Sequence, residues 1–170
     1  MRAAWGLTMV ILVAGAAGAV AGQTKGDPDR RPGLWTMKLT YDDGAYKIPD
    51  STMCLDAKSD RRTTLVGAQM RRSRCSEYSV ARQADGSWSV RTVCVLNGGE
   101  KSVTTGRVTG DLASAYDVVA ESETTGAKWS SENGRHAIRI SARWTGPCLA
   151  GQRGGDVTVN GRTSNVFSSR

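Results

Sequence analysis

The sequence has few of the residues that enzymes use most often for chemistry. It contains a single histidine, His136, among 170 residues, and it lacks Gly-x-Ser-x-Gly, His-Glu-x-x-His and the glycine-rich phosphate loops. His136 stands beside Arg135, where it would need a carboxylate to orient it as a general base. The adjacent acids Asp42 and Asp43 precede Gly44, a pattern typical of a turn. We therefore predict no catalytic residue and expect a protein that is not an enzyme.

Close cysteine pairs of the kind used by zinc sites and thioredoxin-like motifs are also absent. The four cysteines are Cys54, Cys75, Cys94 and Cys148, each far from the next. We expect no metal site and no cofactor. An even number of cysteines in an exported chain predicts two disulfides, for which three pairings are possible. We favour Cys54 with Cys75 and Cys94 with Cys148, and a Cys75–Cys94 bridge across a hairpin is the alternative.

The N-terminus is typical of a secretory signal peptide. Met1 and Arg2 precede an apolar run over residues 3–13, and small residues follow up to a cleavage signal at Ala19-Val20-Ala21. We predict a signal peptide over residues 1–21, cleavage after Ala21, and a periplasmic or secreted protein without a transmembrane span. An uncleaved membrane anchor is the competing interpretation, because the apolar and small stretch approaches the roughly 20 residues that span a bilayer.

Large apolar residues are scarce in the rest of the chain. It has one Phe, four Tyr and 20 Gly, a composition that favours short strands and turns over helices. We predict an all-β fold: an antiparallel meander that forms a small barrel or a strongly curved sheet, with one short helix within residues 55–72. A flexible lead-in over 22–32 is expected before the domain at 33–150. The glycine-rich tail at 151–170 either adds a marginal hairpin or trails off.

Alternation of apolar and polar residues predicts the individual strands. They are expected at 34–41, 45–48, 75–83, 87–96, 101–108, 115–123 and 138–148. In the last of these, Ile138, Ile140, Ala142 and Trp144 share one face. A symmetric loop over 124–134 would place Glu123 opposite Arg135, Val119 opposite Arg139 and Asp117 opposite Ser141. Acidic neighbours would then partly neutralise the stripe formed by Arg135, Arg139 and Arg143.

Five short segments together resemble a bacterial envelope family known as domain of unknown function 3617. They are Arg31-Pro32-Gly33-Leu34-Trp35, Cys54-Leu55, Thr92-Val93-Cys94, Gly98-Gly99 and Arg143-Trp144-Thr145-Gly146-Pro147-Cys148. The resemblance covers about 31–155. It implies an exported, disulfide-bonded β domain, and it carries no established activity or functional residue.

Two kinds of function fit these features. The first is a binding module with an apolar hollow for a lipid-like or other small ligand, which Trp35, Trp88, Trp129 and Trp144 would line. The alternative interpretation of these residues is core filling, except for Trp129, which lies in a polar loop.

The second is an interaction module that docks on a protein or an anionic component of the cell envelope. Its binding to an anionic partner would use the positive charge of the chain. The net charge is +7, with clusters at Arg61-Arg62 and Arg71-Arg72-x-Arg74. Nucleic acid is not an expected partner, because the clusters have no interleaved aromatics or known reading motif.

Overall fold

A computed structural model describes residues 28–46, 48–96 and 98–168, and the predicted signal peptide lies outside them. One large antiparallel sheet holds nine strands in the order β11-β10-β2-β1-β9-β8-β7-β6-β5. The strands are β1 (Gly33–Tyr41), β2 (Ser51–Leu55), β3 (Thr63–Thr64), β4 (Gly67–Arg71), β5 (Cys75–Arg82), β6 (Trp88–Val95), β7 (Lys101–Gly110), β8 (Ala115–Thr125), β9 (Gly134–Gly146), β10 (Asp156–Val159) and β11 (Arg162–Asn165). The helices are α1 (Ala57–Asp60) and three 3-10 turns, η1 (Asp42–Gly44), η2 (Arg72–Arg74) and η3 (Ser130–Glu132).

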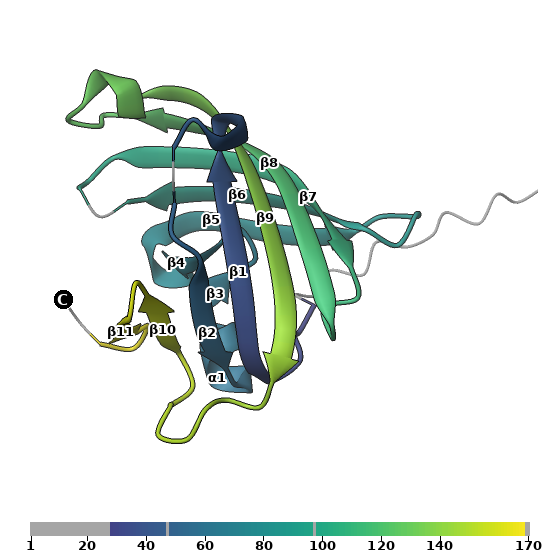
Figure 1. Ribbon diagram of the computed structural model, residues 1–170. Coiled ribbons are helices and arrows are strands. Elements are labelled where there is room, and N and C mark those ends of the chain that lie inside the picture. The colour runs from purple at the N-terminus through teal and green to yellow at the C-terminus, as the bar shows by residue number, and fades with distance from the viewer. Residues whose placement is uncertain (1–27, 47, 97, 169–170) are drawn as a thin grey trace, which may run out of the picture.

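The large sheet is strongly curved and does not close, since β5 and β11 remain as its two edges. Helix α1 and the small β3–β4 sheet lie inside its curve (Figure 1). This architecture confirms the predicted all-β fold with a curved sheet and one short helix. No helix in the described residues is long and apolar enough to cross a membrane.

The concave face carries the hydrophobic core, as the alternation in the sequence predicts. In β9, Ile138, Ile140 and Ala142 are buried while Arg139 and Arg143 are exposed. The same alternation holds in β6, where Trp88, Val90 and Cys94 are all buried. Cys94 therefore points inward from β6.

The predicted pairing of β8 with β9 is confirmed position by position. Glu123 pairs with Arg135, Val119 with Arg139 and Asp117 with Ser141. Ion pairs join Arg135 to Glu121 (3.7 Å) and Arg143 to Asp117 (3.3 Å). Acidic residues of β8 therefore offset part of the arginine stripe on the convex face.

The favoured disulfide pairing is wrong. The bonds are Cys54–Cys148 and Cys75–Cys94, so the alternative bridge across the β5–β6 hairpin is the correct one. Cys75 and Cys94 are direct partners in the ladder, next to a bulge. Cys148 reaches Cys54 because β1 pairs with both β2 and β9, which brings the segments of both cysteines to the same end of β1.

Strands β2, β3 and β4 lie where the sequence predicts none. The strand expected at 45–48 is reduced to a bridge between Tyr41 and Tyr46, and residue 47 lies outside the described chain. In the tail, β10 and β11 form a hairpin, and β10 extends the main sheet by pairing with β2. Val157 of β10 and Val166, which directly follows β11, are buried in the core, so the tail packs as part of the domain.

Candidate functional site

A cavity of about 430 Å³ opens between the concave face of the sheet and the β3–β4 segment. Its lining is mostly apolar: Met37, Leu39, Tyr41, Ile48, Pro49, Val66, Val95, Leu96, Ile140 and Val159. The remaining lining residues are Ser51, Gly67, Arg71, Arg74, Gly98 and Glu100. A concave, mainly apolar surface with few polar groups is typical of a small-ligand site.

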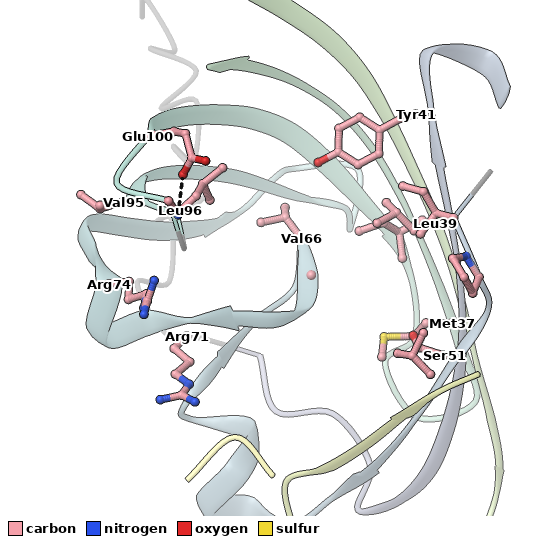
Figure 2. Close-up of a pocket in the computed structure, with 16 residues that line it drawn as sticks. Met37, Leu39, Tyr41, Ser51, Val66, Arg71, Arg74, Val95, Leu96 and Glu100 are labelled. Atoms are coloured by element: carbon pink, nitrogen blue, oxygen red, sulfur yellow. Dashed lines mark hydrogen bonds between the residues drawn. The ribbon is translucent and has the colours of Figure 1, made fainter. Parts of the chain in front are cut away.

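One wall of this cavity comes from the pairing of β1 with β9. Leu39 is the ladder partner of Ile140, and Met37 lies on the same face two residues before it. Val66, which is buried in the turn between β3 and β4, faces this wall from the other side of the cavity (Figure 2). The wall therefore rests on hydrogen-bonded strands.

The charged residues of the lining, Arg71, Arg74 and Glu100, lie on the side opposite β1, whereas Ser51 lies beside Met37 (Figure 2). Arg71 ends β4 and donates from Nη2 to the Ser168 carbonyl at 2.7 Å. Arg74 ends η2 and is exposed. Glu100 accepts a hydrogen bond from the Gly98 N–H at 2.9 Å. Since Cys75 follows Arg74 directly and is bonded to Cys94, the disulfide tethers the arginine segment to β6.

A second cavity of about 370 Å³ adjoins the first and shares Tyr41, Ile48, Leu96 and Glu100 with it. His136 lies in its lining. Asp42 Oδ2 lies 2.8 Å from His136 Nδ1, and Asp42 Oδ1 accepts from the Ala137 N–H at 2.8 Å. These two hydrogen bonds lower the pKa of Asp42 below its usual value, and the one from His136 has the larger effect.

Asp42 thus has two roles, because it forms the predicted turn and also orients the only histidine. An ionised carboxylate is an acceptor only, so the Nδ1 atom carries the proton in this contact. His136 Nε2 is buried and has no hydrogen-bond partner in the described structure. The carboxylate that sequence reasoning required beside His136 is therefore present, contributed by a distant turn. All four cysteines are in disulfides, so no thiol is available as a nucleophile.

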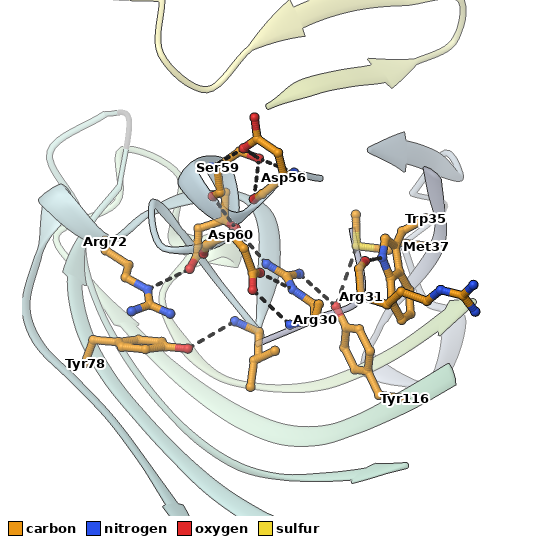
Figure 3. A network of polar contacts seen from close by, with 12 residues as sticks. Arg30, Arg31, Trp35, Met37, Asp56, Ser59, Asp60, Arg72, Tyr78 and Tyr116 are labelled. Atoms are coloured by element: carbon orange, nitrogen blue, oxygen red, sulfur yellow. Dashed lines mark hydrogen bonds and ion pairs between the residues drawn. The ribbon is translucent and has the colours of Figure 1, made fainter. Parts of the chain in front are cut away.

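At the α1 end of the concave face, a buried ion pair fixes the chain ahead of β1 (Figure 3). Arg30 donates from Nε to Asp60 Oδ1 at 2.6 Å and from its backbone N–H to Oδ2 at 2.9 Å. Its two terminal nitrogens donate to the Tyr116 hydroxyl (3.1 Å) and to the Thr63 hydroxyl (2.7 Å). Arg30 is only 4% exposed, although it belongs to the segment expected to be a flexible lead-in.

The four tryptophans proposed as ligand-lining residues line neither of the two cavities. Trp35 and Trp88 are buried in the core, whereas Trp129 is 61% exposed on the loop between β8 and β9. The Trp35 indole donates to the Arg31 carbonyl and the Trp144 indole to the Pro32 carbonyl. The Arg31 guanidinium also stacks 3.7 Å from the centre of the Trp144 ring. Trp35 and Trp144 therefore hold the segment that leads into β1.

Sequence reasoning missed the cavity because its lining comes from separate parts of the chain. The strands predicted at 34–41 and 138–148 contain Met37, Leu39 and Ile140, and the sequence also shows the basic cluster with Arg71 and Arg74. The link between them is the position of β4 inside the curve of the sheet, and no short-range pattern encodes it. In the described residues, no group of three or more His, Cys, Asp or Glu side chains is placed to hold a metal ion.

Comparison with known proteins gives one match. The family model described as "Protein of unknown function (DUF3617)" matches residues 30–148. Neither the curated proteins nor the solved structures contain a match. The matched region runs from the buried Arg30 to Cys148, and so includes both disulfides and β1 to β9. Since the match spans most of the chain, the protein belongs to the DUF3617 family of proteins of unknown function.

Proposed function

We propose that this protein is an exported, non-catalytic module that binds a small apolar or lipid-like ligand in the periplasm or outside the cell. The signal-like segment over residues 1–21 supports export, with cleavage after Ala21. The two disulfides support an oxidising compartment, where such bonds persist.

The observation that carries the binding function is the cavity of about 430 Å³. Its volume falls within the roughly 300–1,000 Å³ that small-molecule sites occupy. Ten of its lining residues are apolar, and they come from β1, β6, β9 and β10 as well as from the loops around β2 and β4. Because paired strands and the Cys75–Cys94 disulfide hold much of this lining, the cavity is preformed and a ligand would not have to order it.

Binding of a neutral apolar dye, N-phenyl-1-naphthylamine, tests this proposal. We expect its fluorescence to rise with the disulfide-bonded protein, and we expect Leu39→Trp, which fills the cavity, to weaken binding at least about tenfold. Val119→Trp is the matched control, because Val119 is 55% exposed on the convex side of β8, which is separated from β1 by β9. Equal binding by the wild type and both variants would place the dye elsewhere and contradict the proposal.

A second candidate function is an interaction module for a protein or an anionic envelope component. Trp129 favours it, because this side chain is 61% exposed on the β8–β9 loop with the Lys128 ammonium 5.2 Å from its ring. Association through exposed charges would weaken strongly with salt, since the Debye length is about 8 Å at physiological ionic strength. The affinity for an apolar ligand in the cavity would change little with salt concentration.

A further inference from the structure

The two arginines of the cavity differ in their surroundings from the arginines on the convex face of the sheet. Arg91 pairs with Glu77 at 3.1 Å, and Arg143 pairs with Asp117 at 3.3 Å. Arg74, by contrast, has no ion-pair partner among residues 28–46, 48–96 and 98–168, and Arg71 is bonded to a neutral carbonyl of Ser168. The cavity lining thus contains two guanidinium groups that form no ion pair with a described carboxylate.

Glu100 forms no ion pair with Arg71 or Arg74 in the described part of the chain. Among the described residues of the lining it is the single acidic one, and it accepts the Gly98 N–H at 2.9 Å. Figure 2 shows Glu100 and Arg74 at separate places on the wall opposite β1, with Arg71 drawn below Arg74 on the same side of the cavity. The cavity therefore has a positive end near Arg71 and Arg74 and an apolar interior at Met37, Leu39, Val66 and Ile140.

From this polarity we infer that the ligand is a single-chain amphiphile with an anionic head, either a carboxylate or a phosphate. The inference rests on the proposed function and specifies its ligand class. The apolar chain lies against Met37, Leu39, Val66 and Ile140, and the head is held by Arg71 and Arg74. Guanidinium groups bind carboxylate and phosphate oxygens through charge-assisted hydrogen bonds, which are stronger than those between neutral groups.

Other heads fit the site less well. A cationic head would be repelled by Arg71 and Arg74, and a neutral head would replace their hydration with weaker contacts. Because Arg74 is exposed and Arg71 half-buried, solvent screens part of the attraction. We therefore expect a preference of about tenfold or somewhat more for an anionic head over a neutral head on the same chain.

Displacement of N-phenyl-1-naphthylamine by amphiphiles of equal chain length tests the inference. The probes are dodecanoate, dodecyl phosphate, dodecanol and dodecyltrimethylammonium, added to the disulfide-bonded full chain. Each is kept below its micelle-forming concentration or, for dodecanol, below its solubility limit. We expect the two anionic probes to displace the dye at concentrations about tenfold lower than dodecanol, and the cationic probe to be weakest. The order of the two anions then identifies whether carboxylate or phosphate is preferred.

Two charge-matched double variants locate the head. Arg71→Gln with Arg74→Gln should remove the anionic preference and leave dodecanol displacement unchanged. Arg61→Gln with Arg162→Gln is the control, because both residues are exposed, neither lines the cavity, and the net charge changes equally. If the first variant does not fold, the probe series on the wild type still decides the head preference.

The possible failures are distinguishable. Equal displacement by dodecanoate and dodecanol would overturn the anionic head but leave the apolar-ligand function standing. Absence of displacement by every probe, together with absence of dye binding, would refute both. Binding to phosphatidylglycerol vesicles without binding of any dispersed amphiphile would refute the single-chain ligand and support docking on an anionic surface.

Discussion

We expect the buried ion pair of Arg30 and Asp60 to contribute strongly to the stability of the fold. Replacing Asp60 by Ala removes the acceptor of two hydrogen bonds from Arg30, at 2.6 and 2.9 Å, and leaves a guanidinium group whose side chain is 2% exposed. Removing one partner of a buried ion pair costs about 3–5 kcal/mol. For a domain of this size, that loss corresponds to a fall in Tm of roughly 6–20 °C. Urea unfolding of the oxidised protein, followed by tryptophan fluorescence, measures it.

Two further variants separate a buried charge from an ordinary surface pair. The double change Arg30→Met with Asp60→Leu removes both charges, so we expect it to cost less than Asp60→Ala alone. Arg91→Gln breaks the pair with Glu77, whose side chains are 47% and 43% exposed, and should cost no more than about 1 kcal/mol. If Asp60→Ala costs no more than Arg91→Gln, then Arg30 is hydrated and the reasoning fails.

Two other predictions concern covalent and acid stability. By the loop-entropy relation, loss of Cys54–Cys148 (separation 94) should cost about 4.7 kcal/mol and loss of Cys75–Cys94 (separation 19) about 3 kcal/mol. Paired Cys→Ser variants compared by urea unfolding check this order, and the reverse order would refute it. Hydrogen bonds from the backbone and hydroxyl of Ser114, and from the N–H groups of Ala115 and Ala113, hold the pKa of Asp111 well below its usual value. Because the folded pKa is the lower one, this stabilisation is present at neutral pH and is lost as the pH falls below about 4. Acid titration of Asp111→Asn should show a shallower loss of stability than the wild type, and identical curves would contradict this assignment.

The parts of the fold that sequence predicted correctly are those set by local pattern. Alternation along β9 placed Ile138 and Ile140 inside, and counting back from the loop after Glu123 gave the full register of β8 with β9. Both depend on residues close in sequence, where the two-residue period of a strand and a hairpin loop fix the pairing.

The parts that sequence could not predict depend on distant contacts. Strand β2 has no clear alternation, since Met53, Cys54 and Leu55 are all buried, and β3 is only two residues long. The Cys54–Cys148 bond follows from β1 lying between β2 and β9, a topology that cysteine spacing does not encode. Likewise, nothing next to Arg30 in sequence indicates that Asp60, Tyr116 and Thr63 would bury it.

The position of β1 between β2 and β9 also determines when the domain can fold. Trp35 and Met37 pair with Trp144 and Ala142, so the first strand needs a partner strand that is synthesised late. A chain that stops before Gly134 has no β9 and leaves the edges of both β1 and β8 unpaired, a state prone to association with other chains. Closing so long a loop before its contacts stabilise it makes folding slow compared with a helical protein of similar size. The nine-stranded sheet can therefore be completed only after β9 has been synthesised, because β9 joins β1 to β8.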